Sequence, residues 1–348
     1  MDSSIPGGSV VPPLFDLQIN GFAGVDFQTP HVRPDELLRA VRGLRANGCT
    51  RFLLTLITDR WDSLLAKLRQ LRQTRDSSPE LRAAIAGWHL EGPFLSSEPA
   101  YHGAHNPAWM LDPTPNHFSE LRVATGDDLV LLTLAPERGG ALDAIALAVS
   151  LGFKVSLGHT NAPATCLREA AAAGATGFTH LGNACPQTLD RHDNILWRVL
   201  ETPGLNISLI ADQRHVSPPL FRLLHRLIPG DRIFYTTDAM AAAGAPPGRY
   251  HLGPLELEVG PDRIVREPGK THFAGSATTP VEAVFHAATM LGVSWRETWQ
   301  RLSDLPARWL GLPTPDPAAA NAPRCEVRVS PAGQLEALRA VLPEPLPA

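Results

Sequence analysis

Residues 84–93, with the sequence AIAGWHLEGP, carry the pattern on which the fold prediction rests. The stretch is mostly apolar, ends on the carboxylate of Glu91, and is then stopped by a Gly-Pro pair. A short apolar run bounded by turn residues is typical of a strand buried on both faces. Strands of this kind occur in parallel sheets that are flanked by helices. We therefore predict a buried strand over Ala84–Glu91.

Seven more stretches of this kind occur along the chain, and helical patterns separate them. The predicted strands are Leu14–Asn20, Arg51–Thr58, Leu129–Leu134, Phe153–Ser156, Thr176–His180, Leu205–Ile210 and Arg232–Thr237. Well-punctuated helices are predicted over Asp35–Asn47, Ala141–Ser150, Pro163–Ala173 and Pro218–Leu227. Strand and helix repeated eight times is the order of a (β/α)8 TIM barrel. A doubly wound sheet is the alternative, but the sequence has no GxGxxG fingerprint.

The composition excludes several classes of protein. The chain has 348 residues, 44% of them hydrophobic, which is enough for a large buried core and excludes a disordered chain. The 31 basic residues are outnumbered by 35 acidic ones, so nucleic acid is not an expected partner. No signal peptide or membrane-spanning run is evident. With four scattered cysteines read as reduced thiols, we expect a soluble cytoplasmic protein with no membrane partner.

The segment after the eighth strand, 250–275, is predicted to be an insertion. In it, Leu255–Val259 and Arg263–Arg266 flank a Gly-Pro-Asp turn, which predicts a β-hairpin. The last helices are predicted over Pro280–Leu291 and Ser294–Leu310.

The barrel is expected to span residues 14–312. The short terminal segments, 1–13 and 313–348, lie outside it. Residues 313–323 read as a Pro/Ala-rich linker, and Cys325–Val329 as one short strand.

Ionisable residues gather where the predicted strands end: Glu91, His159, His180, His215 and Asp238. In barrels of this type the active site lies at the carboxyl ends of the strands. One carboxylate and two imidazoles suit Zn²⁺ or a similar ion with a position left open for water. The ion would supply hydroxide near neutral pH, and Asp238 is placed to transfer protons.

A series of motifs then points to a known family. They are Asp16-Leu-Gln-Ile-Asn-Gly21, His89-Leu-Glu-Gly-Pro93, Gly103-Ala-His-Asn-Pro107, Leu134-Ala-Pro-Glu137, Gly158-His-Thr-Asn161, Thr179-His-Leu-Gly-Asn-Ala184, Ile210-Ala-Asp-Gln-Arg-His215, Thr237-Asp-Ala239 and Ala274-Gly-Ser276. In this order they resemble the N-acetylglucosamine-6-phosphate deacetylases of the amidohydrolase superfamily. The resemblance covers Asp16 to about Leu310.

The resemblance implies an activity and a role for each matching residue. The activity is metal-dependent hydrolysis of the acetamide of an N-acetyl hexosamine phosphate, a small-molecule substrate. Glu91, His159 and His180 would bind the metal, Asp238 would be the acid/base, and His105 would polarise the acetamide carbonyl. The residues implied to contact the sugar phosphate are Ala104, Asn183, Ala184, Arg191, His215, Phe273, Ala274 and Gly275. The alternatives are an amidohydrolase acting on an unphosphorylated N-acetyl sugar or another amide, and a catalytically silent sugar-phosphate binder.

Departures from the superfamily pattern sharpen these expectations. Gln18 and Asn20 stand on the first strand where many amidohydrolases carry the His-x-His of a second metal, so we expect one ion per subunit. Zinc is the first choice, with iron, cobalt and manganese as alternatives. In the loop from Asn183 to Asn194, Arg191 keeps the family's spacing from Asn183, but the residues that follow it, His192-Asp193-Asn194, differ from those of the family. The family's β-sandwich is expected to be reduced or absent, with the terminal segments as its remnants. The resemblance also suggests a homodimer, because in relatives a phosphate-binding arginine crosses the interface.

Overall fold

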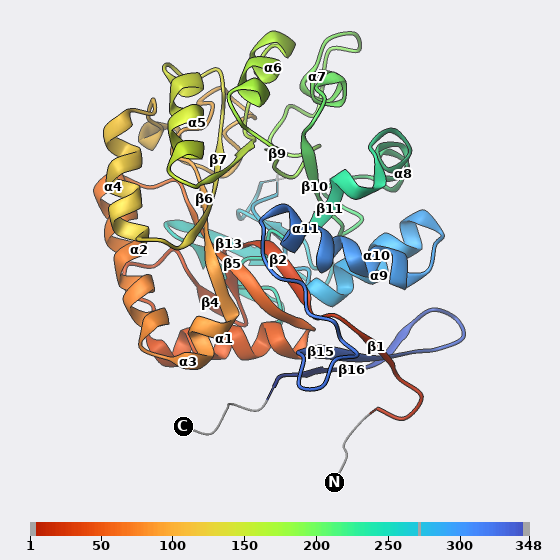
Figure 1. The fold of residues 1–348 in the computed structure, drawn as a ribbon. Coiled ribbons are helices and arrows are strands. Elements are labelled where there is room, and N and C mark those ends of the chain that lie inside the picture. Colours follow the sequence, from red (N-terminus) through yellow and green to blue (C-terminus); the bar gives the residue numbers. More distant parts are fainter. Residues whose placement is uncertain (1–4, 271–272, 344–348) are drawn as a thin grey trace.

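The computed structural model describes residues 5–270 and 273–343. Eight strands form one parallel sheet in the order β11-β10-β9-β8-β7-β6-β5-β2 (Figure 1). Their bounds are β2 (Leu14–Ile19), β5 (Cys49–Ile57), β6 (Ile85–Glu91), β7 (Leu129–Leu134), β8 (Lys154–Leu157), β9 (Gly177–Phe178), β10 (Asn206–Ile210) and β11 (Ile233–Thr236). Each corresponds to one predicted strand, and the predicted (β/α)8 barrel is confirmed.

The barrel closes between its first and last strands just above β11. Ile19 and Ala239 form a parallel bridge, and the N–H of Asn20 donates to the carbonyl of Ala239 at 2.7 Å. Lower in the seam, the buried carboxylate of Asp16 accepts hydrogen bonds from the hydroxyls of Thr236 and Thr237, at 2.6 and 2.7 Å. Side-chain bonds therefore replace the backbone ladder where β2 meets β11.

Helices form the outer layer. Those following the strands are α1 (Pro34–Ala46), α2 (Trp61–Asp76), α3 (Pro79–Ala84), α4 (Pro115–Thr125), α5 (Ala141–Ser150), α6 (Ala164–Ala172), α7 (Ile195–Glu201), α8 (Pro218–Leu227) and α9 (Pro280–Leu291). The sequence sets their ends: Thr279 caps α9 together with Glu282, and Gly292 ends it with a φ of 68°.

The amino-terminal end of the barrel is filled with apolar side chains. Phe15, Leu17, Leu53, Leu131 and Phe234 are buried there against the short helix α11 (Asp304–Trp309). The ring of Trp309 packs 5.3 Å from that of Phe234. The end of the barrel where the strands have their carboxyl ends is therefore the end where an active site is expected.

The prediction of one helix over Ser294–Leu310 is wrong. The segment consists of α10 (Trp295–Trp299), a 3₁₀ turn at Gln300–Leu302, and α11. The break comes at Ser303, whose φ and ψ of −137° and −92° are not helical and whose hydroxyl donates to the carbonyl of Pro13.

The insertion after the eighth strand is larger than the predicted hairpin. It is a three-stranded antiparallel sheet of β12 (Gly248–Leu252), β13 (Leu255–Val259) and β14 (Val265–Arg266). The hairpin strand predicted from residue 263 begins at Val265, because Arg263 turns the chain with a φ of 60°. Residues 271–272 of the insertion lie outside the described residues. A two-stranded ribbon, β3 (Gly21–Phe22) with β4 (Val25–Asp26), follows β2 and was not predicted.

The two terminal segments pair with each other beneath the barrel (Figure 1). β1 (Ser9–Val11), β15 (Arg324–Val329) and β16 (Leu335–Val341) form a three-stranded antiparallel sheet. The predicted strand at Cys325–Val329 is therefore present, and β16 was missed. Residues 1–4 and 344–348 of these segments lie outside the described residues.

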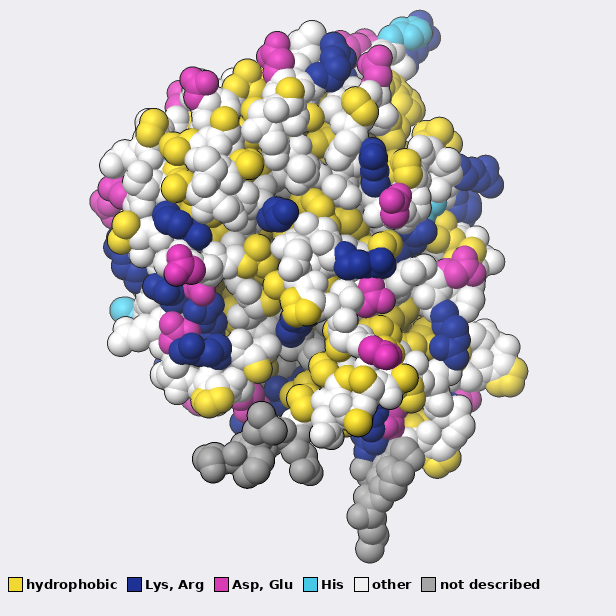
Figure 2. Space-filling view, in the orientation of Figure 1, with side chains coloured by type: hydrophobic (Ala, Val, Ile, Leu, Met, Phe, Trp, Pro, Cys, Tyr) yellow, Lys and Arg dark blue, Asp and Glu magenta, His cyan; other side chains and the backbone are white. Residues whose placement is uncertain are grey.

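The surface carries charges of both signs. On the face in Figure 2, basic and acidic side chains are interspersed. Among the described helices, none is both long and apolar enough to cross a bilayer. The four cysteines are free thiols.

Candidate active site

A cavity of about 530 Å³ opens at the carboxyl ends of the barrel strands. The sequence-predicted site residues that line it are Asn20, Glu91, Ala104, His105, His159, His180, Asn183, Ala184, His215, Asp238, Phe273, Ala274 and Gly275. Insertion residue Leu252 contributes to the wall. The cavity therefore lies between the barrel strands and the inserted sheet.

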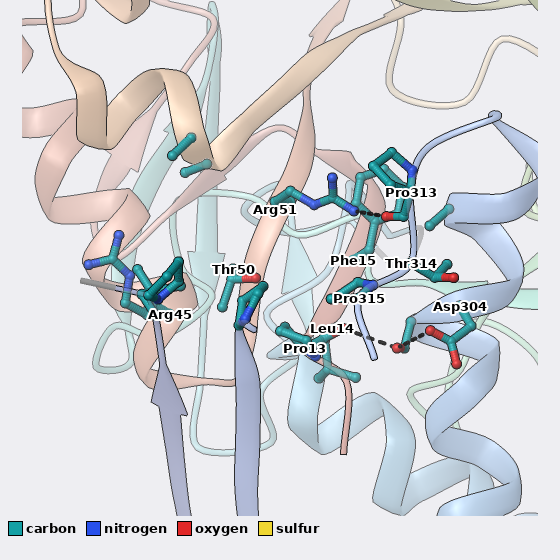
Figure 3. A pocket seen from close by; sticks show the side chains of 17 residues that line it. Pro13, Leu14, Phe15, Arg45, Thr50, Arg51, Asp304, Pro313, Thr314 and Pro315 are labelled. Atoms are coloured by element: carbon teal, nitrogen blue, oxygen red, sulfur yellow. Dashed lines mark hydrogen bonds between the residues drawn. The ribbon is translucent and has the colours of Figure 1, made fainter. Parts of the chain in front are cut away.

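A second cavity, of about 280 Å³, lies at the opposite end of the barrel (Figure 3). Its walls are mostly apolar, and Arg51 crosses one side to donate to the carbonyl of Pro313 at 2.7 Å. No histidine is among its described lining residues, so it lacks the chemistry of the first cavity.

Glu91, the last residue of β6, is surrounded by three imidazoles. Its Oε1 lies 2.8 Å from Nε2 of His180 and 3.2 Å from Nε2 of His159, and its Oε2 lies 3.5 Å from Nε2 of His105. All four side chains are buried. Burial alone would raise the pKa of Glu91, but its interactions with the surrounding imidazoles outweigh burial and hold this pKa well below its usual range.

Three of the site residues share one unusual backbone conformation. His159, His180 and Asp238 each stand two residues beyond the end of a strand, and their φ angles are 50°, 34° and 51°. A left-handed φ is rare outside glycine and costs about 1–3 kcal/mol, and it is concentrated at functional sites. Here the same local turn brings all three side chains to the cavity.

The hydrogen bonds of His159 and His180 leave one ring nitrogen of each facing Glu91. Nδ1 of His159 donates to the carbonyl of Tyr101 at 2.9 Å, so its Nε2 carries the lone pair. Nδ1 of His180 is buried without a partner, and its Nε2 faces Glu91. Burial lowers the pKa of His159 to about 4, which favours the neutral ring that a metal requires.

His105 is held in the other tautomer. The backbone N–H of Thr58 donates to Nδ1 of His105 at 3.4 Å, and the Thr58 hydroxyl lies 2.8 Å from the same atom. Because a backbone N–H can only donate, Nδ1 is an acceptor and the ring proton is on Nε2. His105 thus presents an N–H group to the cavity.

Asp238 faces this cluster from the last strand. Its Oδ1 accepts hydrogen bonds from Nε2 of Gln18 at 2.9 Å and from Nδ2 of Asn20 at 2.7 Å. Burial, and then the negative charge of Glu91, raise the pKa of Asp238 to about 7. The first-strand amides therefore hold one oxygen of Asp238 and leave the other for proton transfer.

The donor set fits a divalent metal ion. Within the described residues, Glu91, His105 and His159 have side-chain nitrogen or oxygen atoms within 4.8 Å of one another, and Nε2 of His180 lies 2.8 Å from Glu91. A carboxylate with neutral imidazoles is a donor set for Zn²⁺ and similar ions. The orphaned Nδ1 of His180 leaves only its Nε2 engaged, on the side of Glu91.

One predicted substrate residue does not reach the cavity. Arg191 is exposed, and its Nε lies 2.9 Å from Nε2 of His192. The other predicted substrate residues line the cavity, and the ring of His215 stands edge-on to Phe273 at 5.0 Å. Within a single chain, Arg191 is therefore separated from the residues with which it was grouped.

Sequence reasoning missed the groups that hold these side chains. They include Asp16 in the barrel seam, Thr58 and Tyr101 behind the imidazoles, and Asp212 behind His215. Only Asp212 left a signal, because an aspartate three residues before a histidine can cap the turn between them. The partners of the others lie 40 or more residues away along the chain.

Comparison with known proteins places the chain among one set of relatives. No protein-family profile matches it. It is 34% identical over 317 residues to N-acetylglucosamine-6-phosphate deacetylase of Mus musculus, covering 88% of this chain and 76% of the relative. It is 30% identical over 311 residues to the enzyme of that name from Vibrio furnissii, covering 89% and 76%. N-acetylgalactosamine-6-phosphate deacetylase of Escherichia coli O157:H7 is 31% identical over 309 residues, covering 86% of this chain and 78% of the relative.

Solved structures agree. The structure of a mutant N-acetyl-D-glucosamine-6-phosphate deacetylase from Mycobacterium smegmatis, in complex with N-acetyl-D-glucosamine-6-phosphate, superposes with a TM-score of 0.85 at 33% identity. The match covers 96% of this chain and 87% of that one.

Proposed function

The chain belongs to the family of N-acetylglucosamine-6-phosphate deacetylases in the amidohydrolase superfamily, and from this premise we propose its reaction. The protein hydrolyses the acetamide of N-acetylglucosamine 6-phosphate, or of a closely related N-acetyl hexosamine phosphate, to the amino sugar phosphate and acetate. The observation that carries the proposal is the grouping of Glu91, three imidazoles and Asp238 around one cavity.

Glu91, His159 and His180 would hold one divalent ion, for which zinc is our first choice and iron, cobalt or manganese the alternatives. A bound ion supplies Lewis-acid activation of water and of the acetyl carbonyl. A single ion is supported by Gln18 and Asn20, because amides are weaker metal ligands than imidazoles and both turn their N–H₂ groups to Asp238.

The chain's own residues would handle the charge and the protons. The Nε2–H of His105 donates to the oxygen of the acetyl group as negative charge develops on it. The free oxygen of Asp238 accepts a proton from the attacking water and returns it to the nitrogen of the leaving amine. The oxygen of the water thereby ends in acetate and one of its protons on the amine nitrogen. Asp238 returns to its starting protonation state.

The substrate would be held by the far wall of the cavity. This wall is formed by Asn183, Ala184, His215 and residues 273–275. Ala104 lines the cavity next to His105. Because one relative is an N-acetylgalactosamine-6-phosphate deacetylase, both N-acetyl hexosamine phosphates are substrates to be compared.

Arg191 would reach a substrate from a second copy of this chain. It is exposed, and the ring of its neighbour Trp197, 42% exposed, donates from Nε1 to the Arg191 carbonyl. Leu223 and Leu227 of α8 are exposed as well. These apolar side chains support a homodimer in which Arg191 serves the partner's cavity.

Two further expectations belong to this proposal. The barrel would comprise residues 14–312, and the terminal sheet of β1, β15 and β16 would be the reduced counterpart of a β-sandwich. A cytoplasmic location is proposed with the phosphorylated substrate, since sugar phosphates are intracellular metabolites.

The function is tested by acetate release from N-acetylglucosamine 6-phosphate and from the unphosphorylated sugar, each with and without added Zn²⁺. We expect rapid zinc-dependent release from the phosphate and slow release from the free sugar. N-acetylgalactosamine 6-phosphate is the matched second substrate. No acetate from any of the three by metal-loaded protein would reject the proposal.

A further inference from the structure

The turn after β10 contains a carboxylate that faces inward and makes three hydrogen bonds. Oδ1 of Asp212 accepts the backbone N–H groups of Arg214 and His215, both at 2.9 Å. Its Oδ2 lies 2.6 Å from Nδ1 of His215. Asp212 is only 2% exposed. Burial opposes its ionisation, but the hydrogen bonds from His215 and from the backbone of the turn outweigh burial and lower the pKa of Asp212.

An ionised carboxylate can only accept, so Nδ1 of His215 carries a proton. Nε2 is then the one ring nitrogen left for the cavity that His215 lines. The ring edge also meets Phe273 at 5.0 Å, which fixes its second side. His215 is thus held between a carboxylate and an aromatic ring. Because the ring is already positioned, no binding free energy is spent on ordering it when the substrate binds.

The same turn is tied to the inserted sheet. The side chain of Arg214 donates to the carbonyl of Asp262 at 2.5 Å, in the turn before β14. The turn is therefore anchored on both sides of His215: Asp212 holds it inside, and Arg214 holds it to the insertion.

Apart from His215, few side chains lining the cavity could bind an anion. Among the described residues that line it, none is a lysine or an arginine. The imidazoles outside the Glu91 cluster are His102 and His215, and Nδ1 of His102 contacts the carbonyl of Gly103 at 2.9 Å. Only His215 has a carboxylate behind it.

We infer that Asp212 is a positioning residue for substrate recognition: it fixes His215, which the proposed function places against the phosphate group of the sugar, with Nε2 toward the cavity. This assignment rests on the proposed function. On binding, Nε2 takes a proton from the phosphate hydroxyl or from solvent, and the N–H so formed donates to a phosphate oxygen. The carboxylate of Asp212 balances the charge on the ring.

A double-mutant cycle separates this role from a structural one. His215→Asn keeps a group that can donate to Asp212 and removes the one at Nε2; we expect the KM for the sugar phosphate to rise about tenfold or more. Asp212→Asn is expected to raise the KM about three- to tenfold. The double variant should be no worse than His215→Asn, because Asp212 acts through His215. Asp316→Asn, at a turn aspartate of the linker, is the matched control and should change nothing.

A second measurement needs no turnover. In ¹⁵N-labelled protein, the His215 signal, assigned by its loss in His215→Asn, should show a protonated Nδ1. Glucosamine 6-phosphate should shift the Nε2 resonance, and glucosamine should not. In Asp212→Asn the proton should move to Nε2, since the new amide can donate to Nδ1.

The outcomes are distinguishable from failure of the proposed function. If no acetate is released while the NMR results hold, the reaction is wrong and the positioning of His215 stands. An unprotonated Nδ1 in the wild type, a KM effect that adds in the double variant, or equal shifts with both sugars would overturn the inference. The wild-type spectrum decides the matter even if Asp212→Asn does not fold.

Discussion

The backbone N–H of Thr58 donates to Nδ1 of His105 over 3.4 Å, and this bond leaves the ring proton of His105 on the nitrogen that faces Glu91. His159 has the opposite arrangement, because its Nδ1 donates to the Tyr101 carbonyl. Two histidines at similar distances from one carboxylate are therefore different chemical groups. His105 is a hydrogen-bond donor, and His159 offers a lone pair.

This difference predicts distinct effects of matched substitutions. His105→Gln should lower kcat about 10²- to 10³-fold, the usual cost of a lost oxyanion donor, while the protein retains its metal. His159→Gln should lose both activity and metal. Metal content measured beside kcat checks the assignment. Loss of metal from His105→Gln, with His159→Gln still loaded, would reverse the two roles.

Asp238→Asn removes the proton-transfer group and keeps an acceptor for the amides of Gln18 and Asn20. We expect kcat to fall about 10²- to 10⁴-fold with KM and metal content little changed. Steady-state kinetics and metal analysis provide the measurement. A variant with near wild-type kcat would show that the proton is carried by another group.

Arg191→Ala is predicted to raise the KM for the phosphorylated substrate about 10- to 100-fold, as expected for the loss of a charged hydrogen bond of about 1.5–3 kcal/mol. Because Arg191 lies outside the cavity of its own chain, mixing this variant with Asp238→Asn should restore low-KM activity in half of the mixed dimers' sites. An unchanged KM would show that Arg191 does not contact the phosphate. No recovery of activity on mixing would show that Arg191 does not act in the partner's cavity.

His225 predicts a pH dependence of stability away from the active site. Its Nδ1 contacts the Phe221 carbonyl at 2.8 Å, its Nε2 lies 2.9 Å from the Tyr235 hydroxyl, and burial lowers its pKa from 6.5 to about 4. Below about pH 6.5 the unfolded chain binds this proton more readily, so the stability contributed by the neutral ring is lost as the pH falls toward 4.

His225→Gln abolishes that titration. Compared with the variant, the wild type should lose about 1–2 kcal/mol more of its unfolding free energy between about pH 8 and about pH 5. Urea unfolding of both proteins at both pH values measures this difference in the free energy of unfolding. Comparing wild type with variant cancels the contributions of the other histidines. Parallel losses in the two proteins would mean that His225 is not buried as a neutral ring.

The sequence predicted the barrel well because buried parallel strands are almost continuously apolar, as in Ile85–Glu91. It located the site because strand ends in a barrel meet at one rim. Strand β12 was missed because its residues are mostly exposed and lack the apolar run on which the strand prediction rests. β16 was missed because its residues are exposed or half-buried, with none fully buried, and they also lack an apolar run. The break at Ser303 depends on its contact with Pro13, 290 residues away along the chain.

The groups that set the chemistry were harder to predict than the reacting groups. Thr58, Tyr101 and Asp16 are ordinary residues in ordinary strands or loops until the fold brings them to His105, His159 and the barrel seam. Arg191 shows the reverse: its spacing from Asn183 matched the family, yet within one chain it lies outside the cavity. Spacing along a loop does not determine the direction in which its side chains point.

Metal reconstitution tests the central claim most directly. Protein stripped of metal is titrated with Zn²⁺ while acetate release from N-acetylglucosamine 6-phosphate is followed. Since Gln18 and Asn20 engage Asp238 as donors, activity should rise linearly and stop at about one equivalent per chain. Full activity without metal, or a requirement for a second equivalent, would contradict the account.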